Sequence, residues 1–153
     1  MAACSGTPSP QLPLSVAEDL QNQFVVDSSD YLAEARAADA ALDYALCLDN
    51  LQKFALAEPE QCDASFWQWQ ARVAENSDNT QAALRARLQW LTFTPNDVWL
   101  RIDIADGYSR LQRLEEGLIV LTYQVEASDE QKTLNDARVF LIEHNGLPKR
   151  AAE

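Results

Sequence analysis

The stretch that decides the fold is Val98-Trp-Leu-Arg-Ile-Asp-Ile-Ala-Asp-Gly-Tyr-Ser-Arg-Leu-Gln-Arg-Leu-Glu-Glu-Gly117. Its large apolar residues follow one another at three or four positions, as in Leu100, Ile104, Tyr108 and Leu111. That spacing places them on one face of a helix, whereas a strand would alternate at every second residue. After Gln112-Arg113, the same spacing of apolar residues starts again at Leu114. The stretch therefore predicts two amphipathic helices joined by a short turn.

Small residues recur along the whole chain at a fixed spacing. Ala71, Ala83 and Pro95 stand twelve residues apart, and Ala105 and Gly117 repeat the first step 34 residues further on. The same spacing occurs 36 residues upstream, at Ala35, Cys47 and Pro59. Small side chains let two helices approach closely, and a proline ends a helix because it lacks the N–H group. The pattern predicts an internal repeat of helix pairs.

We therefore expect an all-α protein of antiparallel helix hairpins. Three hairpins would lie between an N-terminal helix and a C-terminal capping helix. The expected helices cover residues 15–26, 28–40, 43–57, 64–76, 79–93, 97–111, 114–127 and 130–144. Residues 1–14 are rich in proline and serine and predict a flexible tether. Residues 15–146 would form a single helical domain, and residues 147–153 a disordered tail.

The repeat resembles the tetratricopeptide repeat. Ala105, Tyr108, Leu114 and Gly117 stand at positions where that family has small or apolar residues, while Gln112 stands where it usually has glycine. The opening Trp-Leu-Arg-Ile-Asp-Ile-Ala is similar to the variant found in bacterial envelope proteins such as exopolysaccharide-export scaffolds. The resemblance implies a right-handed solenoid with a concave groove for a partner peptide. A generic bundle of helical hairpins is the alternative fold.

The resemblance covers about residues 28–129 and implies a non-enzymatic protein-binding module. In the family, the first helix of each pair lines the concave side. Carried over to this chain, the partner-binding positions are Arg36, Gln68, Arg72, Trp99, Ile102, Asp106 and Arg110. Guanidinium groups pair with carboxylates in a bidentate way. The three arginines would then hold an acidic or C-terminal carboxylate-bearing segment, with Trp99 as the apolar anchor. The alternative is that they neutralise acidic residues of neighbouring repeats.

The first residues, Met1-Ala-Ala-Cys4-Ser-Gly6, resemble the end of a bacterial lipobox. The resemblance implies acylation of Cys4 and a periplasmic, outer-membrane-anchored lipoprotein, with no other membrane contact. Such a protein would be a scaffold or pilot for a pilus, secretion or polysaccharide-export assembly. The apolar segment that precedes a lipobox is not in this sequence, so a cytosolic start stays open. The matching alternative function is a cytosolic chaperone of the type III secretion translocator type, whose length and acidity are similar.

Composition and motifs exclude several other classes of function. The chain has 12 basic and 24 acidic residues and a net charge of −12, which argues against nucleic-acid binding because phosphate contacts need clustered cations. Its four glycines form no phosphate-binding loop. The single histidine, His144, falls where a helix is expected to end. Cys47 and Cys62 read as two buried, inert thiols, and a disulfide between them in an oxidising compartment is the alternative. We therefore expect no metal, no cofactor and no enzymatic activity.

Overall fold

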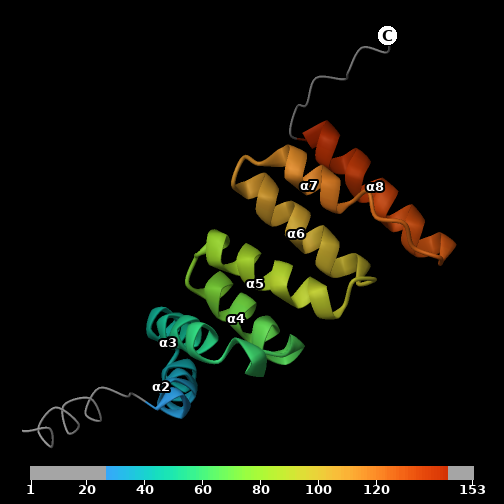
Figure 1. The fold of residues 1–153 in the computed structure, drawn as a ribbon. Coiled ribbons are helices and arrows are strands. Elements are labelled where there is room, and N and C mark those ends of the chain that lie inside the picture. Colours follow the sequence, from blue (N-terminus) through green and yellow to red (C-terminus); the bar gives the residue numbers. More distant parts are fainter. Residues whose placement is uncertain (1–26, 145–153) are drawn as a thin grey trace, which may run out of the picture.

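The computed structural model describes residues 27–144, and the regular secondary structure in this range is helical, with no strand. The elements, numbered as in Figure 1, are α2 (Ser28–Ala40), α3 (Tyr44–Ala57), the 3₁₀ turn η1 (Pro59–Gln61), α4 (Ala64–Asn76), α5 (Thr80–Phe93), α6 (Val98–Arg110), α7 (Leu114–Val120) and α8 (Ser128–His144). The predicted helix at 15–26, the tether at 1–14 with Cys4, and the tail at 147–153 lie outside the described residues.

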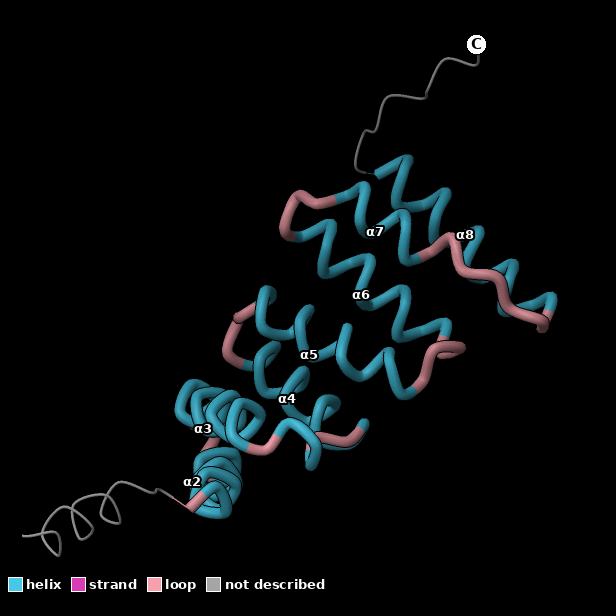
Figure 2. Tube along the Cα trace, in the orientation of Figure 1, coloured by secondary structure: helices cyan, strands magenta, loops and turns pink. Residues whose placement is uncertain are grey.

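The helices follow one another in a row, from α2 at one end to α8 at the other (Figures 1 and 2). Each helix packs mainly on its neighbours in sequence, and α8 packs on both α6 and α7. The tightest contacts join α2 to α3, α4 to α5, and α6 to α7. The all-α expectation is confirmed, with helices packed on their neighbours in sequence, whereas the right-handed solenoid stays a prediction.

Aspartates at repeating positions begin the first helix of each pair. Asp27, Asp63 and Asp97 are the N-caps of α2, α4 and α6 and stand 36 and 34 residues apart. The carboxylate of Asp63 accepts from the backbone N–H of Phe66 at 2.9 Å, and that of Asp97 from Leu100 at 2.9 Å. Each bond satisfies an amide that the helix itself leaves unpaired. The three pairs thus start in the same way.

The turn inside each pair repeats at the same spacing. Leu42, Asp78 and Gln112 all adopt left-handed backbone conformations, with φ between 55° and 59°. In each case the N–H group of the following residue donates to a carbonyl five residues back at 2.8 Å, the bond that closes a helix C-terminus. The bonds are Asp43 to Ala38, Asn79 to Ala74 and Arg113 to Tyr108.

The small residues of the repeat lie where helices approach one another. All six aligned positions are buried: Ala35, Cys47, Ala71, Ala83, Ala105 and Gly117. The approach is closest at Gly117, where a Cβ atom would lie only 3.0 Å from the carbonyl oxygen of Ala105. The small residues therefore stand where neighbouring helices pack closely, as their spacing in the sequence predicted.

One predicted helix is too long. The sequence pattern predicted a helix over 114–127, but α7 ends at Val120. The cause is Arg101 on α6, which donates to the carbonyl of Val120 at 3.2 Å and to that of Pro95 at 2.7 and 3.0 Å. Its guanidinium also lies 3.6 Å from the ring centroid of Tyr123. The guanidinium of Arg101 thus donates to the last carbonyl of α7, and the chain then turns towards α8.

The buried core runs along the row. Leu84 on α5 packs with Leu100 and Ile104 on α6, and so joins the second helix pair to the third. Leu134 and Leu141 bury the inner face of α8 against α6 and α7. Within residues 27–144, no helix combines the length and the apolar character needed to cross a lipid bilayer.

Candidate functional site: the groove between α2 and α4

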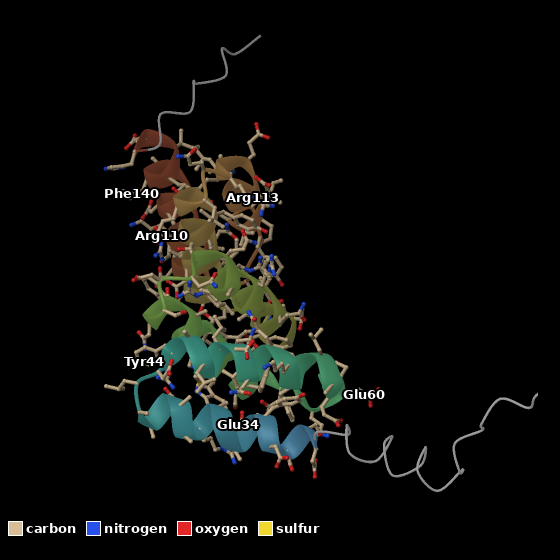
Figure 3. All side chains as sticks on the ribbon, turned by 90° about the vertical axis from the view of Figure 1, so that its left-hand side faces the viewer. Glu34, Tyr44, Glu60, Arg110, Arg113 and Phe140 are labelled. Carbon is tan, nitrogen blue, oxygen red and sulfur yellow. The ribbon has the colours of Figure 1, made fainter. Side chains whose placement is uncertain are left out.

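A groove of about 260 Å³ opens between α2 and α4. We call it the α2–α4 groove. Its lining residues come from four elements and are Leu32, Arg36, Phe54, Gln61, Ser65, Phe66 and Trp69. It lies next to the connection that contains Glu60, which Figure 3 places on the side of the row away from Tyr44 and Arg110.

Aromatic rings form the floor of the groove. The ring centroids of Phe54 on α3 and Phe66 on α4 lie 5.5 Å apart, and Phe66 also meets Trp67 edge to face at 5.2 Å. Phe54 and Phe66 are buried, so they are held by the core. Trp69 is half-buried and leaves part of its ring at the surface. An aromatic surface of this kind offers apolar contact area to a bound chain.

Hydrogen bonds fix the end of the groove. The carboxylate of Glu58 accepts from the hydroxyl of Ser28 at 2.8 Å and from the side-chain amide of Gln61 at 2.9 Å. The start of α2 is thereby tied to the connection between α3 and α4. These bonds connect the two walls of the groove at this end.

Asp39, near the end of α2, ties the two walls together. Its carboxylate accepts from the indole Nε1–H of Trp69 at 2.8 Å and forms an ion pair with Arg72. The hydrogen bond from Arg72 is the main reason why the pKa of Asp39 lies below its ordinary value of 3.8. Asp39 is therefore ionised at neutral pH and already satisfied within the protein.

The three predicted arginines differ in their surroundings. Arg72 is neutralised by Asp39, and Arg110 pairs with Asp106 at 2.9 Å and with Glu75 at 3.7 Å. These two arginines thus form ion pairs with acids on their own helix or the preceding pair, as the alternative interpretation expects. Arg36 is exposed and makes no ion pair within residues 27–144.

The other predicted positions are not gathered in this groove. Gln68 is exposed on α4, and Trp99 on α6 is 70% exposed. Trp99 stands 34 residues after Ser65, a residue of the α2–α4 groove, so it occupies the equivalent place one pair further along. Ile102 is half-buried against the core beneath α8, and Asp106 is held by Arg110. A continuous ladder of free arginines is absent from the described helices.

Sequence reasoning missed most of the groove floor. Phe54 comes from the second helix of a pair, which the family resemblance does not place on a binding surface, and no motif in the sequence singles out Phe66. Like Trp67, Trp69 is a candidate partner anchor on sequence grounds if its side chain is exposed. It stands three residues before Arg72, so the two side chains share a helix face. Both reach the same carboxylate, Asp39.

Three further side chains that could carry chemistry, one histidine and two cysteines, are hydrogen-bonded or buried. Nδ1 of His144 donates to the carbonyl oxygen of Phe140 at 2.9 Å, at the end of α8. Cys47 and Cys62 are buried free thiols, and burial raises the pKa of each to about 11, so they are protonated and poorly nucleophilic at neutral pH. Within residues 27–144, no group of three histidine, cysteine or acidic side chains is placed to hold a metal ion.

Comparisons with known proteins assign no family. A scan against protein-family models gives no match for this chain, and a search of curated protein sequences gives no significant relative. The likeness to tetratricopeptide repeats therefore rests on the residues and turns described above.

Proposed function

We propose that this chain is a non-enzymatic protein-binding module, similar to a tetratricopeptide scaffold, that holds a carboxylate-bearing segment of a partner in the α2–α4 groove. The observation that carries the proposal is the position of Arg36. It is an exposed cation without an ion pair in the described helices, at the edge of a groove with an aromatic floor. The repeated helix pairs supply the rigid support for that groove.

A carboxylate is the group that this site fits. A guanidinium paired with a carboxylate makes two parallel hydrogen bonds, which are stronger than bonds between neutral groups. The amide of Gln61 and the hydroxyl of Ser65 add polar contacts on the opposite wall. Leu32 and Trp69 supply the apolar area beside the cation. A peptide with a free C-terminus or an acidic side chain next to an apolar one meets each of these features.

The net charge of −12 favours this choice of anchor. An acidic protein repels an acidic partner at long range, so such a partner is held only where a local cation outweighs the surrounding field. Of the three arginines predicted to bind a partner, Arg72 and Arg110 are already paired with acids, which leaves Arg36 as the one without an ion pair in the described helices. We therefore expect binding to depend on one arginine rather than on three.

The experiment is a binding measurement of the full chain on an array of octapeptides. The array compares free with amidated C-termini, and glutamate with glutamine at internal positions. We expect the binders to carry a carboxylate beside an apolar residue. Arg36→Gln should weaken them by about tenfold or more, since a charge-assisted pair contributes at least about 1.4 kcal/mol.

Two matched variants sharpen the result. Arg36→Lys keeps the charge but loses the bidentate geometry, so it should recover only part of the affinity. Arg138→Gln removes an exposed arginine of α8 that does not line the α2–α4 groove and should leave these binders unchanged. Equal binding by wild type and Arg36→Gln, or a preference for amidated and uncharged peptides, would refute the proposal.

A further inference from the structure

A second and larger groove, of about 500 Å³, lies between α3 and α5 on the other side of α4. We call it the α3–α5 groove. On α4, Ser65, Phe66 and Trp69 line the first groove, whereas Trp67 and Gln70 line this one. Trp67 lies about half a helical turn from Ser65 and Trp69. The residues that matter here are Leu56, Trp67, Gln70, Arg85 and Leu88.

The floor of this groove contains a buried polar group without a partner. The side chain of Gln70 is only 5% exposed, and its Oε1 atom accepts no hydrogen bond from the described residues. A buried acceptor left unpaired costs roughly 1–3 kcal/mol of stability. Such groups are rare in folded proteins and need an explanation. A donor that enters the groove, with a rotation of the Gln70 amide, would satisfy it.

The rim combines apolar area with one cation. Leu56 is 85% exposed, and Trp67 and Leu88, which line the same groove, are half-buried. Arg85 is exposed and forms no ion pair within the described helices. It is the charged residue among those lining the groove. A complementary occupant brings an apolar side chain and a negative charge.

We propose that the α3–α5 groove binds an extended segment of a partner protein, in which an apolar residue stands next to an acidic one. An extended backbone leaves N–H groups free to donate, as Gln70 requires, whereas the N–H groups inside a helix are already paired. The apolar side chain lies over Leu56 and Trp67, and the carboxylate pairs with Arg85. This surface is separate from the α2–α4 groove, so the module holds two segments on opposite sides of α4.

The test starts from a phage-displayed library of linear dodecapeptides, selected on the full chain. The selected sequences are synthesised and titrated into wild type and into three variants. For peptides of the α3–α5 groove, Arg85→Gln and Gln70→Met should each weaken binding by tenfold or more. Arg36→Gln, in the other groove, should leave their affinity unchanged.

Gln70→Met also changes the melting temperature of the free protein, which gives a second measurement. A glutamine that only supports the fold would not combine a higher melting temperature with a lower affinity. Methionine has a similar shape but no unpaired acceptor, so the free protein should melt about 2 °C or more higher while its affinity falls. The proposal is overturned if no peptide is selected, if all selected peptides respond only to Arg36→Gln, or if Gln70→Met lowers the melting temperature without changing affinity. A consensus with helical spacing that is indifferent to Gln70 also overturns it.

Discussion

At the scale of single residues, Asp39 connects α2 to α4 and predicts a pH effect. Because Arg72 lowers the pKa of this carboxyl, the folded protein binds its proton less tightly than the unfolded chain does. The stabilisation is therefore complete above the ordinary value of 3.8 and is lost as pH falls through the lowered pKa. Asp39→Asn should cost about 1 kcal/mol at pH 7, measured by urea unfolding.

The difference between wild type and Asp39→Asn should vanish in strong acid, where the wild-type carboxyl is also neutral. Asp49→Asn is the matched control. Asp49 pairs with Lys53 one turn away on α3, and both side chains are about half exposed. It should cost less, about 0.3–0.5 kcal/mol. A constant difference between wild type and Asp39→Asn at every pH would show that the ion pair is not the cause.

At the scale of helices, two glycines test how closely α6 and α7 pack. Gly107 has space for a methyl group, since its Cβ would meet only Leu84 at an ordinary 3.4 Å. Gly107→Ala should therefore stabilise the protein by up to about 1 kcal/mol through helix propensity. Gly117→Ala has the same gain in propensity but presses on the backbone oxygen of Ala105 at 3.0 Å.

We expect the clash to cancel or reverse the gain at Gly117, since overpacking costs roughly 1–3 kcal/mol. Thermal unfolding of the two variants, measured side by side, checks this. Equal stabilisation at both positions would contradict the close approach of the two helices.

The turns between paired helices also carry strain that can be measured. Leu42 has a φ of 59° and its side chain is 68% exposed, so it has an unfavourable backbone and little packing to lose. Leu42→Gly should stabilise the protein by about 0.5–1 kcal/mol, because glycine adopts this conformation without a steric penalty. Leu42→Ala removes the same side chain without freeing the backbone and should give no gain. A gain in both variants, or in neither, would contradict this reading of the turn.

At the scale of the whole molecule, the local sequence pattern predicted where the helices lie. Contacts between distant residues decided where α7 ends and which acid pairs with Arg72. The bounds of α2 and α4 agree with the predicted 28–40 and 64–76 because an aspartate caps each start. The end of α7 could not be predicted, because it depends on Arg101 reaching from another helix. The same limit applied to Arg72, because a sequence does not say which acid of the preceding pair faces it. Asp106, by contrast, stands four residues before Arg110 and is a local partner that helical spacing indicates.

The indole N–H resonances of the tryptophans test the central claim most directly. Trp69 lies in the α2–α4 groove and donates its N–H to Asp39, whereas Trp67 lines the α3–α5 groove. The best carboxylate-bearing octapeptide is titrated into the ¹⁵N-labelled full chain. We predict that the Trp69 indole signal shifts and saturates, that Trp67 stays unchanged, and that Arg36→Gln abolishes the shift. A Trp69 signal that does not move under binding, or moves equally in Arg36→Gln, would contradict the account.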